Sequence, residues 1–496
     1  MNSRTILISS VFAAVIAFAS AATADEKARM TEAMKQSVVS LETSFHGYEQ
    51  LQPWRHKALT HNHAHACAVG EYEVLTTAWN AANLAYVKGL RHGQNEFVGA
   101  KVKLVDYESN LCLIELDPNA MGEPLKPLVF SEEYPKGAEV DFYWLSSDNR
   151  MYNGRGYLDR VRVQRTNISY EKRLHYVVAN TSRPTSTGQV YCIDSKPIGI
   201  ACWANDNKEA GLIPGEVINS FLRAASKAEY AGFGAVGFAV SDLLDPVMRS
   251  FLKMPPSLKD GVYVNDVHTL GTACEILKQG DVILAIDGKT LSSYGRFEDA
   301  KYEQLDFEHL ITSRDVGDNI SLEVFRDGRK KQVKTEVTNF KTTQMLVPFH
   351  EYDRQSEYVI TGGFILQKLT REYLGQWGDD WTGKVSPHLY HYYRDLAYKP
   401  APDRSEIVIL SYVLPSPISL GYKDLGQLVV SKFNGMAIRS IADIITARKL
   451  RADSKYDVIE FEMDNPVVVI PRAELPAADV FISRNYGVTK LQNVNP

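Results

Sequence analysis

The chain has 496 residues, and at roughly 150 residues per domain this length predicts about three domains. Its 55 Lys and Arg residues are balanced by 60 Asp and Glu residues, so no basic field exists that would attract nucleic acid or an anionic membrane as the main partner. The five cysteines are too few for disulfides to be the main source of stability.

The N-terminus has the form of a secretory signal peptide. Arg4 precedes an apolar run over residues 6–18, and Ala22-Thr23-Ala24 has the small-x-small form of a signal-peptidase site. We therefore predict a signal peptide over residues 1–24, cleavage after Ala24, and a secreted or periplasmic protein. The alternative is an uncleaved anchor, but the run is short for a span of about 20 residues. No later segment is apolar enough to span a membrane.

The mature chain begins with a predicted helix and continues as a β-rich domain. Ala, Met and Lys at helical spacing predict a helix over residues 25–40. Short β-rich runs separated by turn residues then extend to about residue 218. We expect strands at residues 73–77, 101–105, 111–116, 139–145, 157–163, 175–178 and 198–203. Seven or more short strands at such intervals predict an all-β barrel or sandwich.

From Gly232 the pattern alternates strands with helical stretches at residues 245–252 and around 307–313. The run LKQGDVILAIDG, over residues 277–288, has a Gly-Asp turn, a buried strand and an Asp-Gly turn. A third segment, residues 358–473, loosely repeats this design, with strands predicted near 407–412 and 429–433 and a helix near 441–449.

Three groups of side chains have two interpretations each. The pairs Cys67/Cys112 and Cys192/Cys202 either form disulfides or are small buried hydrophobic residues, and Cys274 is left over. The histidines at alternate positions resemble metal ligands, but no carboxylate or cysteine other than Cys67 has ligand spacing, so we predict no metal and no cofactor. These histidines are His61, His63 and His65, with His56 nearby. The aromatic run at residues 390–393 suggests ligand stacking but is more typical of core packing.

The motifs resemble those of the Deg/HtrA family, in particular its plant-type branch. LKQGDVILAIDG and the upstream GVYVNDV are similar to its PDZ domain, and residues 358–473 to its degenerate second PDZ-like domain. EYEVLTTAWNAAN, VDYESNLCLIELD and RPTSTGQVYCIDSKPIGIA are similar to its protease domain. The resemblance implies a mainly β protein, with a chymotrypsin/trypsin-like double β-barrel followed by two PDZ-like α+β domains. We place the protease domain at 25–225, the PDZ domains at 231–340 and 345–475, and a tail at 476–496.

The resemblance also implies that catalysis has decayed. The family's general-base histidine falls on Trp79, its aspartate on Asn110 and its nucleophile on Ser186, at intervals of 31 and 76 residues. An indole has no basic nitrogen, so Trp79 cannot activate a serine hydroxyl. Loss of the aspartate charge alone costs about 10⁴ in rate in such a triad. Pro184, at the position of an oxyanion-hole donor, has no N–H, and one such donor is worth about 10² to 10³.

The PDZ resemblance implies peptide binding. The carboxylate-binding loop falls on residues 235–238 and opens a strand to which an extended peptide can add. We predict that Val236, Gly237, Phe238, Ala239, Val240, Leu310 and Ile311 bind apolar C-termini or unfolded segments. In the second PDZ-like domain only Gly362-Gly363-Phe364 resembles this loop, which suggests a role in assembly. The resemblance further implies a homo-oligomer, a trimer or a multiple of one.

The leading hypothesis is therefore an inactive pseudoprotease that binds peptides as a chaperone, adaptor or regulator of protein quality control. The alternative is an active serine endopeptidase in which a non-standard base, such as His175, serves Ser186. A third possibility is a structural subunit that assembles with an active paralogue.

Overall fold

The computed structural model describes residues 30–181, 186–378, 380–463 and 466–494. The first part is a closed six-stranded barrel with the strand order β1-β2-β3-β6-β5-β4. Its strands are β1 (Val38–Phe45), β2 (Thr60–Ala68), β3 (Glu73–Thr76), β4 (Leu84–Arg91), β5 (Val98–Asp106) and β6 (Leu111–Leu116). The helix predicted over residues 25–40 is wrong at its end, because only residues 30–35 of the described part are helical. The β-branched Val38 and Val39 instead start β1, which closes the barrel by pairing with both β2 and β4.

A second closed barrel follows, with the order β10-β11-β12-β9-β8-β7. Its strands are β7 (Glu139–Leu145), β8 (Met151–Gln164), β9 (Arg173–Asn180), β10 (Val190–Ile193), β11 (Lys196–Ala204) and β12 (Glu209–Pro214), with α2 (Pro118–Met121) before it and α3 (Gly215–Ala225) after it. Each of the seven predicted strands overlaps one of the strands in the two barrels. The predicted all-β barrel architecture is confirmed.

The next domain, which we call the first α+β domain, is a sheet of order β13-β14-β15-β19-β20 with β16 beside β15 and a β17–β18 hairpin. The strand predicted from the Gly-Asp and Asp-Gly turns is β15, and all five of its residues are buried. The elements are β13 (Phe238–Asp242), α4 (Pro246–Phe251), β14 (Val262–Val267), β15 (Val282–Ile286), β16 (Lys289–Thr290), β17 (Arg296–Asp299), β18 (Glu303–Asp306), α5 (His309–Thr312), β19 (Asn319–Arg326) and β20 (Arg329–Glu336).

The second α+β domain contains a sheet of order β27-β26-β24-β23-β22-β21-β28, with β25 beside β24. Its strands are β21 (Tyr358–Thr361), β22 (Phe364–Lys368), β23 (Val408–Val413), β24 (Leu428–Phe433), β25 (Met436–Ala437), β26 (Tyr456–Phe461), β27 (Val468–Pro471) and β28 (Gln492–Asn493). Its helices are α6 (Arg371–Leu374), α7 (Pro387–His391), α8 (Ala442–Leu450) and α9 (Leu475–Tyr486), with a π-helical turn, η5 (Tyr392–Leu396). The residues that we expected to form a tail thus include most of α9 and β28, which pairs with β21.

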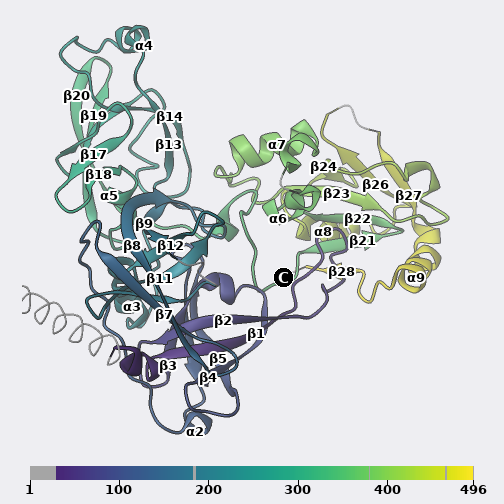
Figure 1. Ribbon diagram of the computed structural model, residues 1–496. Coiled ribbons are helices and arrows are strands. Elements are labelled where there is room, and N and C mark those ends of the chain that lie inside the picture. The colour runs from purple at the N-terminus through teal and green to yellow at the C-terminus, as the bar shows by residue number, and fades with distance from the viewer. Residues whose placement is uncertain (1–29, 182–185, 379, 464–465, 495–496) are drawn as a thin grey trace, which may run out of the picture.

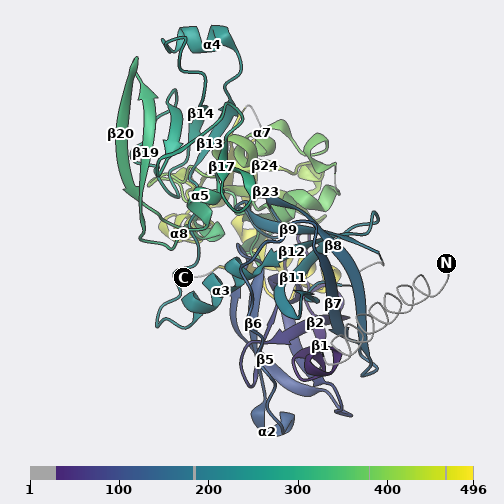
Figure 2. The same cartoon turned by 60° about the vertical axis from the view of Figure 1, so that its left-hand side comes forward.

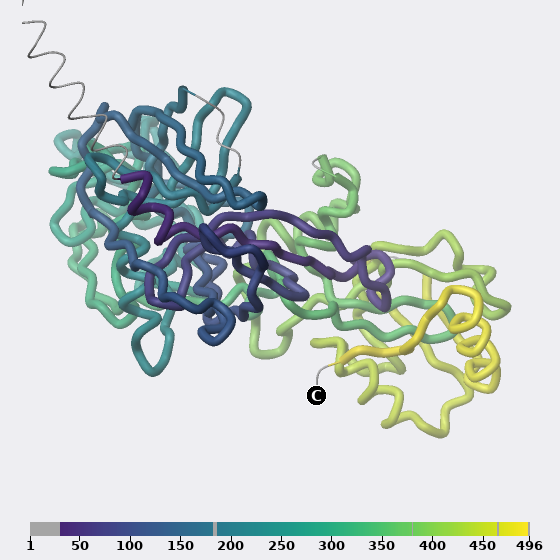
Figure 3. Tube along the Cα trace, turned by 60° about the horizontal axis from the view of Figure 1, so that its bottom comes forward, coloured from purple at the N-terminus to yellow at the C-terminus, as the bar shows by residue number. Residues whose placement is uncertain are grey.

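The two α+β domains lie on different sides of the barrels. Figure 1 shows the first of them next to β8 and β9 of the second barrel, and the second of them, in yellow-green, on the right of the view. Figure 2 shows the same placement of the first α+β domain from another direction. In Figure 3 the purple β1–β2 hairpin extends to the second α+β domain, where Trp54 packs with Tyr358 and Ile360. The loops between barrel strands therefore face both neighbours.

No helix in the described part of the chain is long and apolar enough to cross a membrane. The predicted signal peptide lies outside the described residues.

All five cysteines are free thiols, and four of them are buried, so the small-hydrophobic interpretation applies in this structure. Within the described ranges, no group of three or more His, Cys, Asp or Glu side chains is placed to hold a metal ion. His61 and His63 are exposed, whereas His65 is buried and its Nδ1 is 3.2 Å from the carbonyl oxygen of Leu145.

Candidate functional site

The positions predicted for the catalytic base and aspartate lie in contact. Trp79 is in the short 3-10 helix η1 (Ala78–Asn80), which directly follows β3. Its backbone N–H donates to Oδ1 of Asn110 at 3.0 Å, and the Ala78 N–H donates to the carbonyl oxygen of Asn110. Asn110 is buried in the β5–β6 turn with a φ of 57°, a conformation that asparagine adopts more readily than most residues. Asn110 therefore orients the Trp79 backbone rather than a catalytic side chain.

The Ser186 turn lies beside the same helix. The Thr187 hydroxyl donates to Oδ1 of Asn80, and Gly188 packs so closely that an added Cβ would be 1.9 Å from the carbonyl oxygen of His65. Pro184 lies outside the described residues. Between the residues that the structure describes, no hydrogen bond joins the Ser186 hydroxyl to a histidine, lysine or carboxylate. The turn that carries Ser186 is therefore tied to η1, the helix that contains Trp79, through the Thr187–Asn80 hydrogen bond.

The two buried histidines of the barrels have little basicity. Burial lowers the pKa of both His65 and His175 to about 4. Nδ1 of His175 lies 2.9 Å from the carbonyl oxygen of Arg173 at the start of β9. A histidine with such a pKa is a weak general base at neutral pH, so His175 is a poor candidate for the non-standard base.

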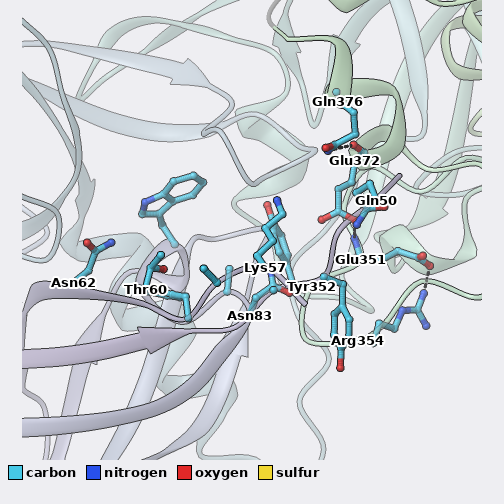
Figure 4. A pocket seen from close by; sticks show the side chains of 17 residues that line it. Gln50, Lys57, Thr60, Asn62, Asn83, Glu351, Tyr352, Arg354, Glu372 and Gln376 are labelled. Atoms are coloured by element: carbon cyan, nitrogen blue, oxygen red, sulfur yellow. Dashed lines mark hydrogen bonds and ion pairs between the residues drawn. The ribbon is translucent and has the colours of Figure 1, made fainter. Parts of the chain in front are cut away.

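The indole of Trp79 is half exposed, at 51%, and lines a pocket of about 430 Å³ between the first barrel and the second α+β domain. Figure 4 shows Thr60 and Asn62 on the barrel side of this pocket and Glu372 and Gln376 on the other side. Burial, together with the nearby Glu351 carboxylate, raises the pKa of Glu372 to about 7. An aromatic surface and polar groups therefore occupy the place where the family's catalytic histidine is expected.

The predicted peptide-binding strand lines a second cavity, of about 380 Å³, which we call the β13 groove. Its walls include all five residues predicted on the loop and on β13, namely Val236, Gly237, Phe238, Ala239 and Val240. The opposite wall contains Phe307 and Glu308, and the Phe307 ring stacks on Phe238 with a centroid distance of 5.8 Å. The groove thus runs next to the edge strand β13, and charged side chains such as Asp306 and Glu308 line it together with the two buried phenylalanines.

The two predicted helix residues are placed differently. Ile311 is fully buried in the core of the first α+β domain, and Leu310 packs against that core. Neither is among the residues that line the groove. Because these two side chains face the core, Phe307 and Glu308, just before the helix, form the wall instead.

Gly237 is required by the backbone of the loop. Its φ is +78°, and an added Cβ would be 2.6 Å from the carbonyl oxygen of Thr272. Only glycine avoids both the left-handed strain and this contact. The loop is fixed on each side, because Thr272 N–H donates to the Ala235 carbonyl and His268 N–H donates to the Gly237 carbonyl.

Residues of both neighbouring domains complete the groove. Arg165, Tyr170, Glu171 and Lys172 come from the loop between β8 and β9. From the second α+β domain come Arg394 and Tyr398, and the Tyr398 ring stacks on His268. These walls could not be predicted, since none of their residues belongs to a recognisable motif.

Buried charges join the β8–β9 loop to the first α+β domain. The Arg173 guanidinium donates to the carbonyl oxygens of Glu108, Thr312 and Gly234. The Glu108 carboxylate accepts the backbone N–H groups of Tyr170 and Glu171. Oε1 of Glu171 accepts the Val236 N–H at 3.1 Å. Burial, with the Glu108 carboxylate nearby, raises the pKa of Glu171 to about 7.

Comparison with known proteins agrees with this architecture. Residues 234–337 and residues 347–492 each match the PDZ domain family. Protease Do-like 2, chloroplastic, of Arabidopsis thaliana is 26% identical over 88% of this chain and 71% of its own length. Protease Do-like 4, mitochondrial, of the same plant is 25% identical over 88% of this chain and 80% of its own length.

Among solved structures, the HtrA-type protease AlgW with decapeptide has a TM-score of 0.48 and 17% identity, over 63% of this chain and 98% of that chain. The match to the Do-like proteases extends over the barrels and both PDZ domains. The chain belongs to the Deg/HtrA family.

Proposed function

We propose that the protein is a secreted or periplasmic pseudoprotease that binds polypeptide segments, with apolar C-termini or unfolded segments as ligands. The observation that carries the proposal is a contrast between two sites. Trp79 and Asn110 stand together where a histidine and an aspartate would be needed, whereas all five residues predicted on the peptide-binding strand line the β13 groove. Catalysis needs a basic nitrogen that an indole lacks, but strand addition needs only a free strand edge and an apolar pocket.

The groove favours apolar side chains at the ligand's C-terminus. Phe238 and Phe307 stack on each other in its lining, Val236 lies in the loop before β13, and Val240 lies on β13 itself. Such a site would suit a chaperone, an adaptor or a regulator of protein quality control. Membership of the family supports assembly into a trimer or a multiple of one, which light scattering of the purified protein would measure.

The test is cleavage and binding by the purified mature chain, residues 25–496. We expect neither the wild type nor Ser186→Ala to cleave casein, and both to bind a fluorescent ten-residue peptide that ends in valine with a free carboxylate. The same peptide with an amidated C-terminus is the control and should bind weakly. Cleavage by the wild type that Ser186→Ala abolishes would support the alternative, an endopeptidase with a non-standard base.

A further inference from the structure

The N–H of Val236 in the loop of the first PDZ domain already has an acceptor. Oε1 of Glu171 lies 3.1 Å from it, and both residues are buried, with 6% of Glu171 and 5% of Val236 exposed. Glu171 also lines the β13 groove, together with the residues of β13 itself. A side-chain carboxylate therefore occupies the end of the groove at which a peptide's terminal carboxylate would have to bind.

One backbone N–H cannot serve two carboxylates at full strength, so the two ligands compete. We propose that Glu171 is an internal ligand of the β13 groove, and that a C-terminal peptide binds by displacing its side chain from the Val236 N–H. This inference rests on the proposed function of the groove, and it adds a regulating residue from the protease domain. The groove is then closed by the chain's own barrel until a competing carboxylate arrives.

The backbone around Glu171 is held independently of its side chain. Glu108 accepts the backbone N–H groups of Tyr170 and Glu171, at 3.1 and 2.8 Å. Arg173 fixes the first PDZ domain to the barrel through the carbonyls of Thr312 and Gly234. The side chain of Glu171 can therefore rotate away while the loop and the domain contact remain in place. Because the domains stay attached, the internal carboxylate returns at a high effective concentration.

The internal contact is also weak enough to be displaced. A charged acceptor strengthens a hydrogen bond, but the Glu171 carboxylate is desolvated and lies close to a second carboxylate, that of Glu108. Both effects penalise its ionised form, and they raise its pKa to about 7. Near and above neutral pH the contact between Glu171 and the Val236 N–H is therefore weakened, and a peptide carboxylate can compete with it.

The test uses two substitutions of the same residue with opposite expected effects. Glu171→Ala removes the internal ligand, so at pH 8 the valine-ending peptide should bind several-fold more tightly than to the wild type. Glu171→Gln keeps an oxygen that accepts the Val236 N–H and removes the charge penalty, so this variant should bind the peptide several-fold more weakly. Misfolding would weaken binding in both variants and cannot produce this pair of results.

The matched control is Glu133→Ala, an exposed glutamate of the barrel domain, which should leave the affinity unchanged. Equal affinity of the wild type and Glu171→Ala would overturn the proposed competition while leaving peptide binding intact. Absence of binding in every variant would instead contradict the proposed function, and this inference with it.

Discussion

Each of the two PDZ domains holds a carboxylate against a glycine-containing loop, but the carboxylates come from different places. In the first domain Glu171 of the barrel accepts the Val236 N–H at 3.1 Å. In the second domain Asp479 accepts the Gly362 N–H at 2.8 Å. Asp479 lies on α9, which belongs to the same folding unit as the loop, whereas Glu171 belongs to a neighbouring domain.

The surroundings of the two loops differ accordingly. The loop at residues 362–363 is the turn between β21 and β22, and it is covered by side chains of its own domain. A Cβ added to Gly362 would be 2.6 Å from Ile418 and 3.2 Å from Leu475, at the start of α9. The loop at residues 235–238 faces the β13 groove instead. The same local contact therefore stabilises a fold in one domain and closes a ligand site in the other.

The largest effect that we expect is a loss of peptide affinity when a glycine of the first loop is replaced, and the same change in the second loop should affect only stability. Gly237→Ala places a Cβ in the left-handed region, at a cost of about 1–2 kcal/mol, and within 2.6 Å of the Thr272 carbonyl oxygen. The loop must shift, and we expect peptide affinity, measured by fluorescence anisotropy, to fall more than tenfold. Gly363→Ala, whose Cβ would be 2.4 Å from the Leu414 carbonyl oxygen, should lower the Tm and leave the affinity unchanged.

Gly280→Ala is the matched control for backbone strain in the first PDZ domain. Its φ is +97°, but an added Cβ meets no atom within 4 Å. A loss of affinity as large as that of Gly237→Ala would show that instability of the domain, and not the position of the loop, controls binding.

The next effect is a pH dependence of peptide binding that belongs to Glu171. In the closed state the buried site beside Glu108 raises its pKa to about 7, against the opposing influence of Arg173, Arg165 and the Val236 N–H. Displacement moves the side chain into water, where its ordinary pKa is about 4.3. Binding then releases a proton between these two values. We therefore expect affinity to rise from pH 5 to pH 8, by at most about tenfold per pH unit.

The control is Glu171→Gln, which has no proton to release and should show a flatter profile over the same range. Lys172, the next residue, forms an ion pair with Glu308 at 2.6 Å. His268, which also lines the groove, has its pKa lowered to about 4 by burial and titrates below this window. A wild-type profile as flat as that of Glu171→Gln would contradict displacement of an ionisable internal ligand.

Much of the fold could be predicted from local patterns. The strands at residues 111–116 and 139–145 coincide with β6 and β7, because their sequences are apolar runs with turn residues on either side. The Gly-Asp and Asp-Gly turns located β15 for the same reason. The helix over residues 25–40 extended too far, since Val38 and Val39 pair with distant strands that no local pattern reveals.

The residues of the candidate site likewise divide into those that local motifs predict and those that they do not. The 31-residue interval between Trp79 and Asn110 corresponds to a real contact, and β13 lines a groove, because both follow motifs. Leu310 and Ile311 were expected at the groove from the family resemblance, but both pack into or against the core of their domain. Glu171 belongs to no motif, and its role depends on how a barrel loop meets a separate domain. Contacts of that kind follow from domain packing, which the order of residues does not encode locally.

The smallest expected effect on binding tests the second loop. Asp479→Ala removes the acceptor of the Gly362 N–H. Burial raises the pKa of the Asp479 carboxyl, which means that its ionised form is already destabilised. We expect a loss of about 1 kcal/mol in the free energy of unfolding, measured by urea denaturation, and no change in peptide affinity. Asp453→Ala, at an exposed position, should change neither quantity.

If Asp479→Ala tightened peptide binding as Glu171→Ala is expected to do, the loop at residues 362–363 would also be a closed ligand site. The distinction would then lie in which peptide each domain accepts, and not in whether its carboxylate is structural. An unchanged affinity with a lowered stability would instead assign the competition to the loop whose carboxylate comes from another domain.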